Sequence, residues 1–287
     1  MRECHLPSSS VVVGIDGSRA AVRAALWAID EAVSRDMPLR MICAINPDGT
    51  KQHDLPGQAR ELATAELAVR YAFMAVESTE KLVKIEVEVI QDSPIRALIE
   101  ASRSAAVMCV GAIGQAHFAP DRVGSTAATL ASSAHCPVAI IRGRDRPFAD
   151  RGSILAYIGT ARDGGGVLQA ALEEAQLRGL PLQAVTAWQS RFTDVHDLRA
   201  VAEGNRGALA HLDRLIAPWA RRYPDVDISS VAVHGSLLDH LAKNVTSVRL
   251  VVMGTHDCAA TQIVEPAANA LLHDADCSVL IVGSGHL

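Results

Sequence analysis

Short runs of apolar residues alternate along the first half of the chain with longer stretches in which apolar residues recur every three or four positions. The short runs are mostly rich in β-branched residues and are bounded by Gly, Pro or Asp, which predicts strands. The periodic stretches predict helices. Such alternation is typical of a parallel sheet covered by helices on both faces. The predicted strands are residues 11–15, 39–45, 83–90, 106–110 and 138–141, and the predicted helices are residues 22–33, 58–78, 94–104 and 125–134.

The same order of elements occurs a second time, so the chain is an internal duplication. Residues 11–15 correspond to 154–158 and residues 110–111 to 253–254, at an offset of 143 positions that falls to 141 near the end of the chain. The predicted strands of the second copy are residues 153–158, 182–188, 226–234, 248–253 and 278–282.

The duplication predicts two tandem α/β domains, each with a five-stranded parallel sheet. We place an amino-terminal tail at residues 1–10, the first domain at 11–142 and the second at 153–287. The polar segment 143–152 contains Gly and Pro and is the natural linker. Sheets of this kind bind ligands beyond the carboxyl ends of their strands, at the point where the strand order reverses.

The amino-acid composition and net charge exclude some classes of binding partner. Hydrophobic residues make up 49% of the 287 residues and aromatic residues only 3%, so the core must be largely aliphatic. A formal net charge of −5 provides no positive field for nucleic acid or anionic lipid. Neither a membrane span of roughly 18 apolar residues nor the apolar centre of a secretory signal is found. We therefore expect a cytoplasmic protein without nucleic-acid or membrane partners.

The six cysteines include no Cys-x-x-Cys pair, and several lie within apolar runs. This pattern favours reduced, structural cysteines over a redox-sensing or metal-binding role. The run His256-Asp257-Cys258 has no partners at ligand spacing and favours a surface position over a metal site.

A glycine-rich turn follows the fourth predicted strand of the first domain. Gly111 terminates the strand, Gly114 comes three residues later, and Gly124-Ser125 opens the last helix. Glycine permits a close approach of the backbone to a ligand, and the free amides of a helix amino terminus attract anions. The turn therefore predicts a polyphosphate site, to which Arg122 and His117 would add positive charge.

Asp16 follows the first strand, in the run Gly14-Ile15-Asp16-Gly17-Ser18. Two interpretations are open for it. Asp16 caps the helix that begins around residue 19, as Asp and Ser often do. Alternatively, it contacts the ribose or adenine of a ligand, because it lies at a strand carboxyl end beside the predicted anion site. Residues 44–47, after the second strand, would form the remaining wall.

Three segments together resemble the universal stress protein family, in the tandem two-domain form common in actinobacteria. They are Gly111-x2-Gly114-x9-Gly124-Ser125, residues 13–18 and residues 136–138. The resemblance covers nearly the whole chain. It implies an adenine-nucleotide α-hydrolase-like fold that binds ATP accompanied by Mg²⁺, and a role in stress response or growth control.

The resemblance also implies roles for single residues. Asp16 would touch the nucleoside, Ala44 would pack on adenine, and Val110 would line the pocket. The motif glycines with Ser125 and Thr126 would hold the ribose and phosphates. The complete set of expected nucleotide-binding residues is Gly14, Ile15, Asp16, Ala44, Val110, Gly111, Gly114, Arg122, Gly124, Ser125 and Thr126.

The first domain departs from the family pattern beside the second motif glycine. Gln115 stands where many members have Arg, and Ala116-His117 replaces the usual glycine pair. Compensation of phosphate charge is therefore weaker, while the backbone amides that form most of the cradle remain.

The second domain departs further. Gly159 stands at the aspartate position, Asp257 replaces the second glycine, and Glu265-Pro266 replaces Gly-Ser. A carboxylate at this position repels phosphate, and proline removes an amide donor. Residues 163–166 are glycine-rich but lack the Lys-Ser/Thr of a Walker sequence. We expect one nucleotide per chain, in the first domain.

No Walker sequence, kinase catalytic set or Gly-x-Ser-x-Gly elbow occurs, so turnover beyond slow, incidental ATP hydrolysis is not expected. The leading hypothesis is a regulator whose 111–125 loop is ordered by ATP for a protein partner. The alternative is an interaction module of the same fold that binds no nucleotide. Adenylyl transfer would need a reactive group that the sequence does not offer.

The final strands of the two copies, near residues 135–141 and 277–282, are expected to be edge strands. Long apolar edges tend to pair with other strands. In the family such edges pair two domains, so the resemblance implies a pseudo-dimer within one chain and further association into a homodimer.

Overall fold

A computed structural model gives the fold of the chain. The contacts divide it into two units, Met1–Gly143 and Arg144–Leu287, and the boundary lies at the start of the predicted linker. The described residues are 9–46, 55–114, 123–143, 152–159, 164–189, 198–244, 247–255, 270, 272 and 276–283.

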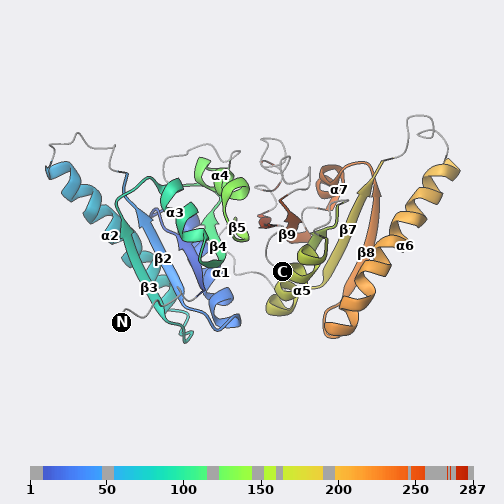
Figure 1. Ribbon diagram of the computed structural model, residues 1–287, viewed down its shortest axis with the longest axis horizontal. Coiled ribbons are helices and arrows are strands. Elements are labelled where there is room, and N and C mark those ends of the chain that lie inside the picture. Colours follow the sequence, from blue (N-terminus) through green and yellow to red (C-terminus); the bar gives the residue numbers. More distant parts are fainter. Residues whose placement is uncertain are drawn as a thin grey trace, which may run out of the picture. The chain divides into compact units, whose positions relative to one another are not determined.

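The first unit is built on a parallel sheet with the strand order β3-β2-β1-β4-β5 (Figure 1). Val11, Val12 and Val13 of the central strand are fully buried, as expected for a strand covered on both faces. The order reverses between β1 and β4. Strands β2 and β3 lie beyond β1 on one side of this point, and β5 lies beyond β4 on the other. The strands are Ser10–Gly14 (β1), Leu39–Ala44 (β2), Ile85–Ile90 (β3), Ala105–Gly111 (β4) and Val138–Ile141 (β5).

Helices connect these strands and cover the sheet. Helix α1 (Arg19–Ser34) packs on β1 and β4, and α2 (Leu55–Glu77) packs on β2, β3 and α1. Helices α3 (Pro94–Ser102) and α4 (Ser125–Ser133) contact each other and pack on β4 and β5, respectively. The pair α1 and α2 covers one face of the sheet, and the pair α3 and α4 covers the other. This follows from right-handed crossovers, because the chain first runs from β1 through β2 to β3 and then crosses back to β4 and β5 on the other side of β1.

The second unit repeats this topology with the order β8-β7-β6-β9-β10 and parallel neighbours. Helix α6 packs on β7 and β8 through the buried Leu212 and Ile216 and so covers the core of the second unit. Its elements are β6 (Ser153–Tyr157), α5 (Gly164–Arg178), β7 (Leu182–Trp188), α6 (Leu198–Arg222), β8 (Ile228–His234), α7 (Leu237–Asn244), β9 (Val248–Gly254) and β10 (Ser278–Val282).

The predicted element boundaries are wrong by a few residues at several ends. β3 begins at Ile85 instead of residue 83, and β8 begins at Ile228 instead of residue 226. Val226 belongs to a turn in which its amide donates to the carbonyl of Tyr223 at 3.3 Å. β-Branched residues next to a strand therefore look like strand in the sequence, while the chain is still completing the preceding turn.

Four of the cysteines lie in the described residues, and all four are buried. Burial raises the pKa of the Cys136 thiol to about 12, which keeps it protonated at neutral pH. No group of three or more potential metal-ligating side chains gathers in the described part of the chain. Over the same residues, no helix is both long and apolar enough to cross a membrane.

The edge strand β3 is joined to β2 by a bidentate ion pair. Arg40 donates from Nε and Nη2 to the two carboxylate oxygens of Glu88 at 2.5 and 2.7 Å. These hydrogen bonds hold the pKa of Glu88 below its ordinary value. The pair therefore stabilises the fold above the unfolded-state pKa of Glu88, and this contribution is lost as the pH falls through the lower folded-state pKa.

We expect Glu88→Gln to lower the urea midpoint at neutral pH and to bring wild type and variant closer together in acid. Urea titrations at neutral pH and at about pH 3 would measure this difference. Glu100→Gln is the matched control, because the Glu100 side chain is 77% exposed in its pair with Arg103. An equal gap between wild type and Glu88→Gln at both pH values would contradict the expectation.

Candidate nucleotide site

A cavity of about 320 Å³ lies at the carboxyl ends of β1, β2 and β4, where the strand order of the first unit reverses. This is the position at which open parallel sheets bind ligands, and the volume is in the range of small-molecule pockets. Its lining residues are Gly14, Ile15, Asp16, Ser18, Ala21, Ile42, Ala44, Pro94, Leu98, Val110, Gly111, Ile113, Gly114, Gly124, Ser125, Thr126 and Ala127.

Ten of the eleven residues expected from the sequence line this one cavity. The eleventh, Arg122, lies outside the described residues, as do Gln115 and His117. The ten residues come from five separate places in the chain and meet only through the sheet topology. They are Gly14, Ile15, Asp16, Ala44, Val110, Gly111, Gly114, Gly124, Ser125 and Thr126.

Gly111 is required by packing between β4 and α1. A Cβ at this position would lie 2.7 Å from the backbone carbonyl carbon of Ala20 and 2.9 Å from the amide nitrogen of Ala21. Both atoms belong to the backbone of the first turn of α1, so neither can rotate away. The glycine thus allows the start of α1 to close against the end of β4 and to form the inner wall of the cavity.

Gly114 is required for a different contact. A Cβ there would lie 2.7 Å from Oδ2 of Asp16. The turn after β1 and the turn after β4 therefore approach each other where the Asp16 carboxylate faces the backbone of Gly114. The other carboxylate oxygen, Oδ1, accepts a hydrogen bond from the amide of Ser18 at 2.9 Å. The Ser18 amide therefore fixes the side chain of Asp16 at the cavity, where it leaves no space for a Cβ at residue 114.

The interpretation of Asp16 as a helix cap is wrong, because Ser18 is the N-cap of α1. The hydroxyl of Ser18 accepts a hydrogen bond from the amide of Ala21 at 3.1 Å. Asp16 lies two residues before the cap and orients the turn through the Ser18 amide. This arrangement leaves the Asp16 carboxylate among the residues that line the cavity.

Helix α4 points its amino terminus at the cavity without a side-chain cap. Its N-cap is Gly124, which offers no side chain to accept a hydrogen bond from the first-turn amides. The amide of Gly124 itself donates to the carbonyl of Ala112 at 2.8 Å and fixes the helix start beside β4. Ser125, Thr126 and Ala127 then line the cavity from the first turn. Uncapped amides at a helix start form a site for an anion.

The remaining wall is apolar and includes three residues that were not predicted from the sequence. Ile42 lies two positions before Ala44 and therefore projects from the same face of β2. Leu98 and Pro94 reach the cavity from α3, which no sequence motif marks. The alternation along β2 was an available signal for Ile42. The contribution of α3 required the fold.

Comparison with known proteins agrees with this architecture. The model of the Universal stress protein family matches residues 8–142. Over 289 residues, the chain is 48% identical to universal stress protein Rv2028c of Mycobacterium tuberculosis, with 100% of each chain covered. The chain belongs to the universal stress protein family. It is also 41% identical over 285 residues to universal stress protein Rv3134c of the same organism, with 98% of each chain covered.

A solved structure shows the same fold over both domains of this universal stress protein. The crystal structure of a universal stress protein from Archaeoglobus fulgidus matches with a TM-score of 0.65 and 15% identity, covering 95% of each chain. The tandem arrangement of two α/β domains is therefore found in both sequence relatives and structure.

The second domain carries different residues at the equivalent strand ends. Gly159 follows β6 where Asp16 follows β1, and Gly254 ends β9 where Gly111 ends β4. Asp257 and Glu265-Pro266, which were predicted to replace the second glycine and the Gly-Ser pair of the motif, lie outside the described residues. The described part of the second domain thus keeps the strand-end glycine but not the carboxylate.

Proposed function

We propose that the first domain of this universal stress protein binds ATP and acts as a nucleotide-dependent regulator of a stress or growth response. One observation carries the proposal. The amino terminus of α4, whose N-cap Gly124 has no side chain, lines the same cavity as the Asp16 carboxylate. The amides of α4 would hold phosphate, and Asp16 would accept hydrogen bonds from the nucleoside. The apolar wall of Ile42, Ala44 and Leu98 would accommodate the adenine ring.

Mg²⁺ would accompany the phosphates. This cation keeps most of its coordination to phosphate oxygens and water, so it does not need a dedicated cage of protein carboxylates. Asp16 is the only charged residue among those described as lining the cavity. The proposal therefore assigns the binding of phosphate to backbone amides and to the hydroxyls of Ser125 and Thr126.

Isothermal titration calorimetry of the purified full chain with Mg²⁺-ATP tests the proposal. One ATP-binding site per chain is expected. Gly114→Ala should weaken binding by about tenfold or more, because the new Cβ displaces the Asp16 carboxylate and removes a hydrogen bond to a charged group worth about 1.5 kcal/mol or more. The fold should be retained, since the Cβ meets only the end of one side chain.

Gly165→Ala is the matched control. Gly165 lies in the first turn of α5 in the second domain, and a Cβ there would meet nothing within 4 Å. This variant should bind ATP as the wild type does. Two equivalent sites per chain would contradict the assignment to the first domain. Absence of binding at saturating ATP would favour the interaction module that takes no nucleotide.

A further inference from the structure

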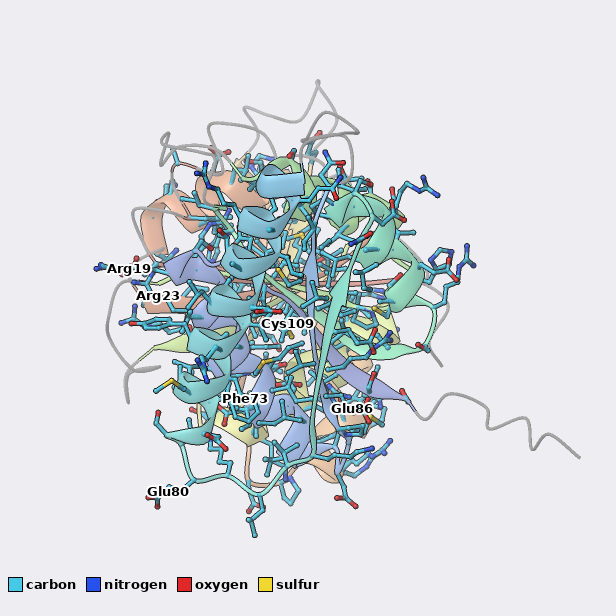
Figure 2. The ribbon with its side chains drawn as sticks, turned by 90° about the vertical axis from the view of Figure 1, so that its left-hand side faces the viewer. Arg19, Arg23, Phe73, Glu80, Glu86 and Cys109 are labelled. Atoms are coloured by element: carbon cyan, nitrogen blue, oxygen red, sulfur yellow. The ribbon has the colours of Figure 1, made fainter. Side chains whose placement is uncertain are left out.

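Helix α2 carries two apolar stripes, of which only one faces the protein. Its inner stripe is buried against the first domain. The outer stripe is formed by Leu67, Tyr71 and Met74, whose exposed fractions are 66%, 70% and 61%. Spacings of four and three residues place these three side chains on one face of the helix. Figure 2 looks onto α2 from this side of the first unit. The buried stripe consists of Ala65, Val69, Ala72 and Val76.

The counterpart helix of the second domain does not have an outer apolar stripe. Helix α6 buries Leu212 and Ile216, and the residues on its opposite face are exposed. That opposite face carries Ala210, Arg214 and Ala217. Both helices cover the same pair of strands in their own domains, so the fold does not require large apolar side chains at this position. The apolar surface of α2 therefore belongs to a function other than folding.

A further exposed apolar side chain follows the end of the helix. Leu82, in the connection from α2 to β3, is 98% exposed. The stripe from Leu67 to Met74 extends over about two turns of α2. Large apolar side chains gathered on one exposed helix face indicate an interaction surface.

Charges beside the stripe indicate what covers it. Arg70 and Glu77 lie two turns apart on the same flank of α2, and both are exposed. In the described part of the chain, neither residue takes part in an ion pair. If two α2 helices pack antiparallel about a two-fold axis near Met74, Arg70 of each copy lies opposite Glu77 of the other. The same operation sets the two Met74 side chains against each other.

We propose that two copies of this chain associate through α2, packed antiparallel about a two-fold axis near Met74. The outer stripe and the Arg70–Glu77 flank are self-complementary, which is the requirement for a two-fold interface. A pair of single helices buries less surface than an obligate dimer, so the association is expected to depend on protein concentration. The proposal does not depend on nucleotide binding.

Sedimentation velocity over a concentration series tests this interface. We expect a reversible monomer–dimer equilibrium for the wild-type chain. Leu67→Glu/Met74→Glu should raise the dimer dissociation constant by about tenfold or more, because it places one carboxylate at the centre of the apolar contact and another two turns away. Ala210→Glu is the matched control on the outer face of α6 and should leave the equilibrium unchanged.

Exchanging the charges of Arg70 and Glu77 distinguishes the antiparallel α2 dimer from the binding of a different partner to the outer stripe. Arg70→Glu and Glu77→Arg should each weaken the dimer several-fold, since each creates two like-charge pairs across the axis. The double variant Arg70→Glu/Glu77→Arg restores opposite charges and should return to the wild-type dissociation constant. Circular dichroism would confirm that these surface variants are folded. A monomeric wild type throughout the micromolar range, a dimer insensitive to Leu67→Glu/Met74→Glu, or a double variant without restoration would overturn the proposal.

Discussion

Gly111→Ala is expected to destabilise the first domain by about 1–3 kcal/mol and to abolish measurable ATP binding. The added Cβ meets the backbone of the first turn of α1 at 2.7 Å, so either β4 or α1 must shift. Removing the Ala20 side chain as well would not relieve the contact, because backbone atoms remain within 2.9 Å. A shift at this point opens the inner wall of the cavity, beside Asp16 and the start of α4.

Urea unfolding followed by circular dichroism measures the change in stability, and titration with Mg²⁺-ATP measures binding. Gly207→Ala is the control, because Gly207 lies exposed in α6 and a Cβ there would meet nothing within 4 Å. Alanine is the better helix former by about 0.8–1 kcal/mol, so this control should be unchanged or slightly more stable. Equal stability of Gly111→Ala and the wild type would show that α1 does not press on β4 as closely as the structure indicates.

Arg178→Ala is expected to destabilise the second domain by about 3–5 kcal/mol. Arg178 donates from Nε to Oε2 of Glu174 at 2.7 Å, and the two side chains are only 5% and 2% exposed. Removing the guanidinium leaves the carboxylate buried without this counter-charge, which costs more than the loss of an ordinary surface ion pair. The equivalent pair in the first domain, Glu31 with Arg35, leaves the arginine 29% exposed. Its loss should therefore cost less.

The urea midpoint of the unfolding step of the second domain measures this effect. Arg103→Ala serves as the control, since Arg103 and Glu100 form a pair whose side chains are 56% and 77% exposed. Exposed pairs contribute at most about 1 kcal/mol. Similar losses in the two variants would indicate that water reaches Glu174 and screens its charge.

Much of the fold followed from local pattern. The five apolar runs of each copy became strands in the predicted order, and the repeat between the copies placed the boundary of the two units near Gly143. The order of strands and helices then fixed which turns lie together, because the carboxyl ends of parallel strands share one edge. For this reason Asp16, Ala44, Gly111 and Gly124 line a single cavity.

Other features depended on contacts between residues far apart in the sequence. The sequence marked Gly111 and Gly114 as permissive backbone, while the structure shows that Gly111 accommodates the backbone of α1 and Gly114 accommodates the Asp16 carboxylate. The choice of Ser18 over Asp16 as the helix cap also depended on the path of one turn.

The sequence by itself determined the repeat, the parallel sheet that a repeated βα pattern implies, and the glycines and aspartate at the strand ends, since periodicity and chain connectivity are local properties. Only the tertiary structure decided that Leu98 of α3 closes the cavity and that the Leu67, Tyr71 and Met74 side chains face outward. Apolar residues on both sides of a helix have the same hydropathy in the sequence, and burial depends on which side meets the sheet.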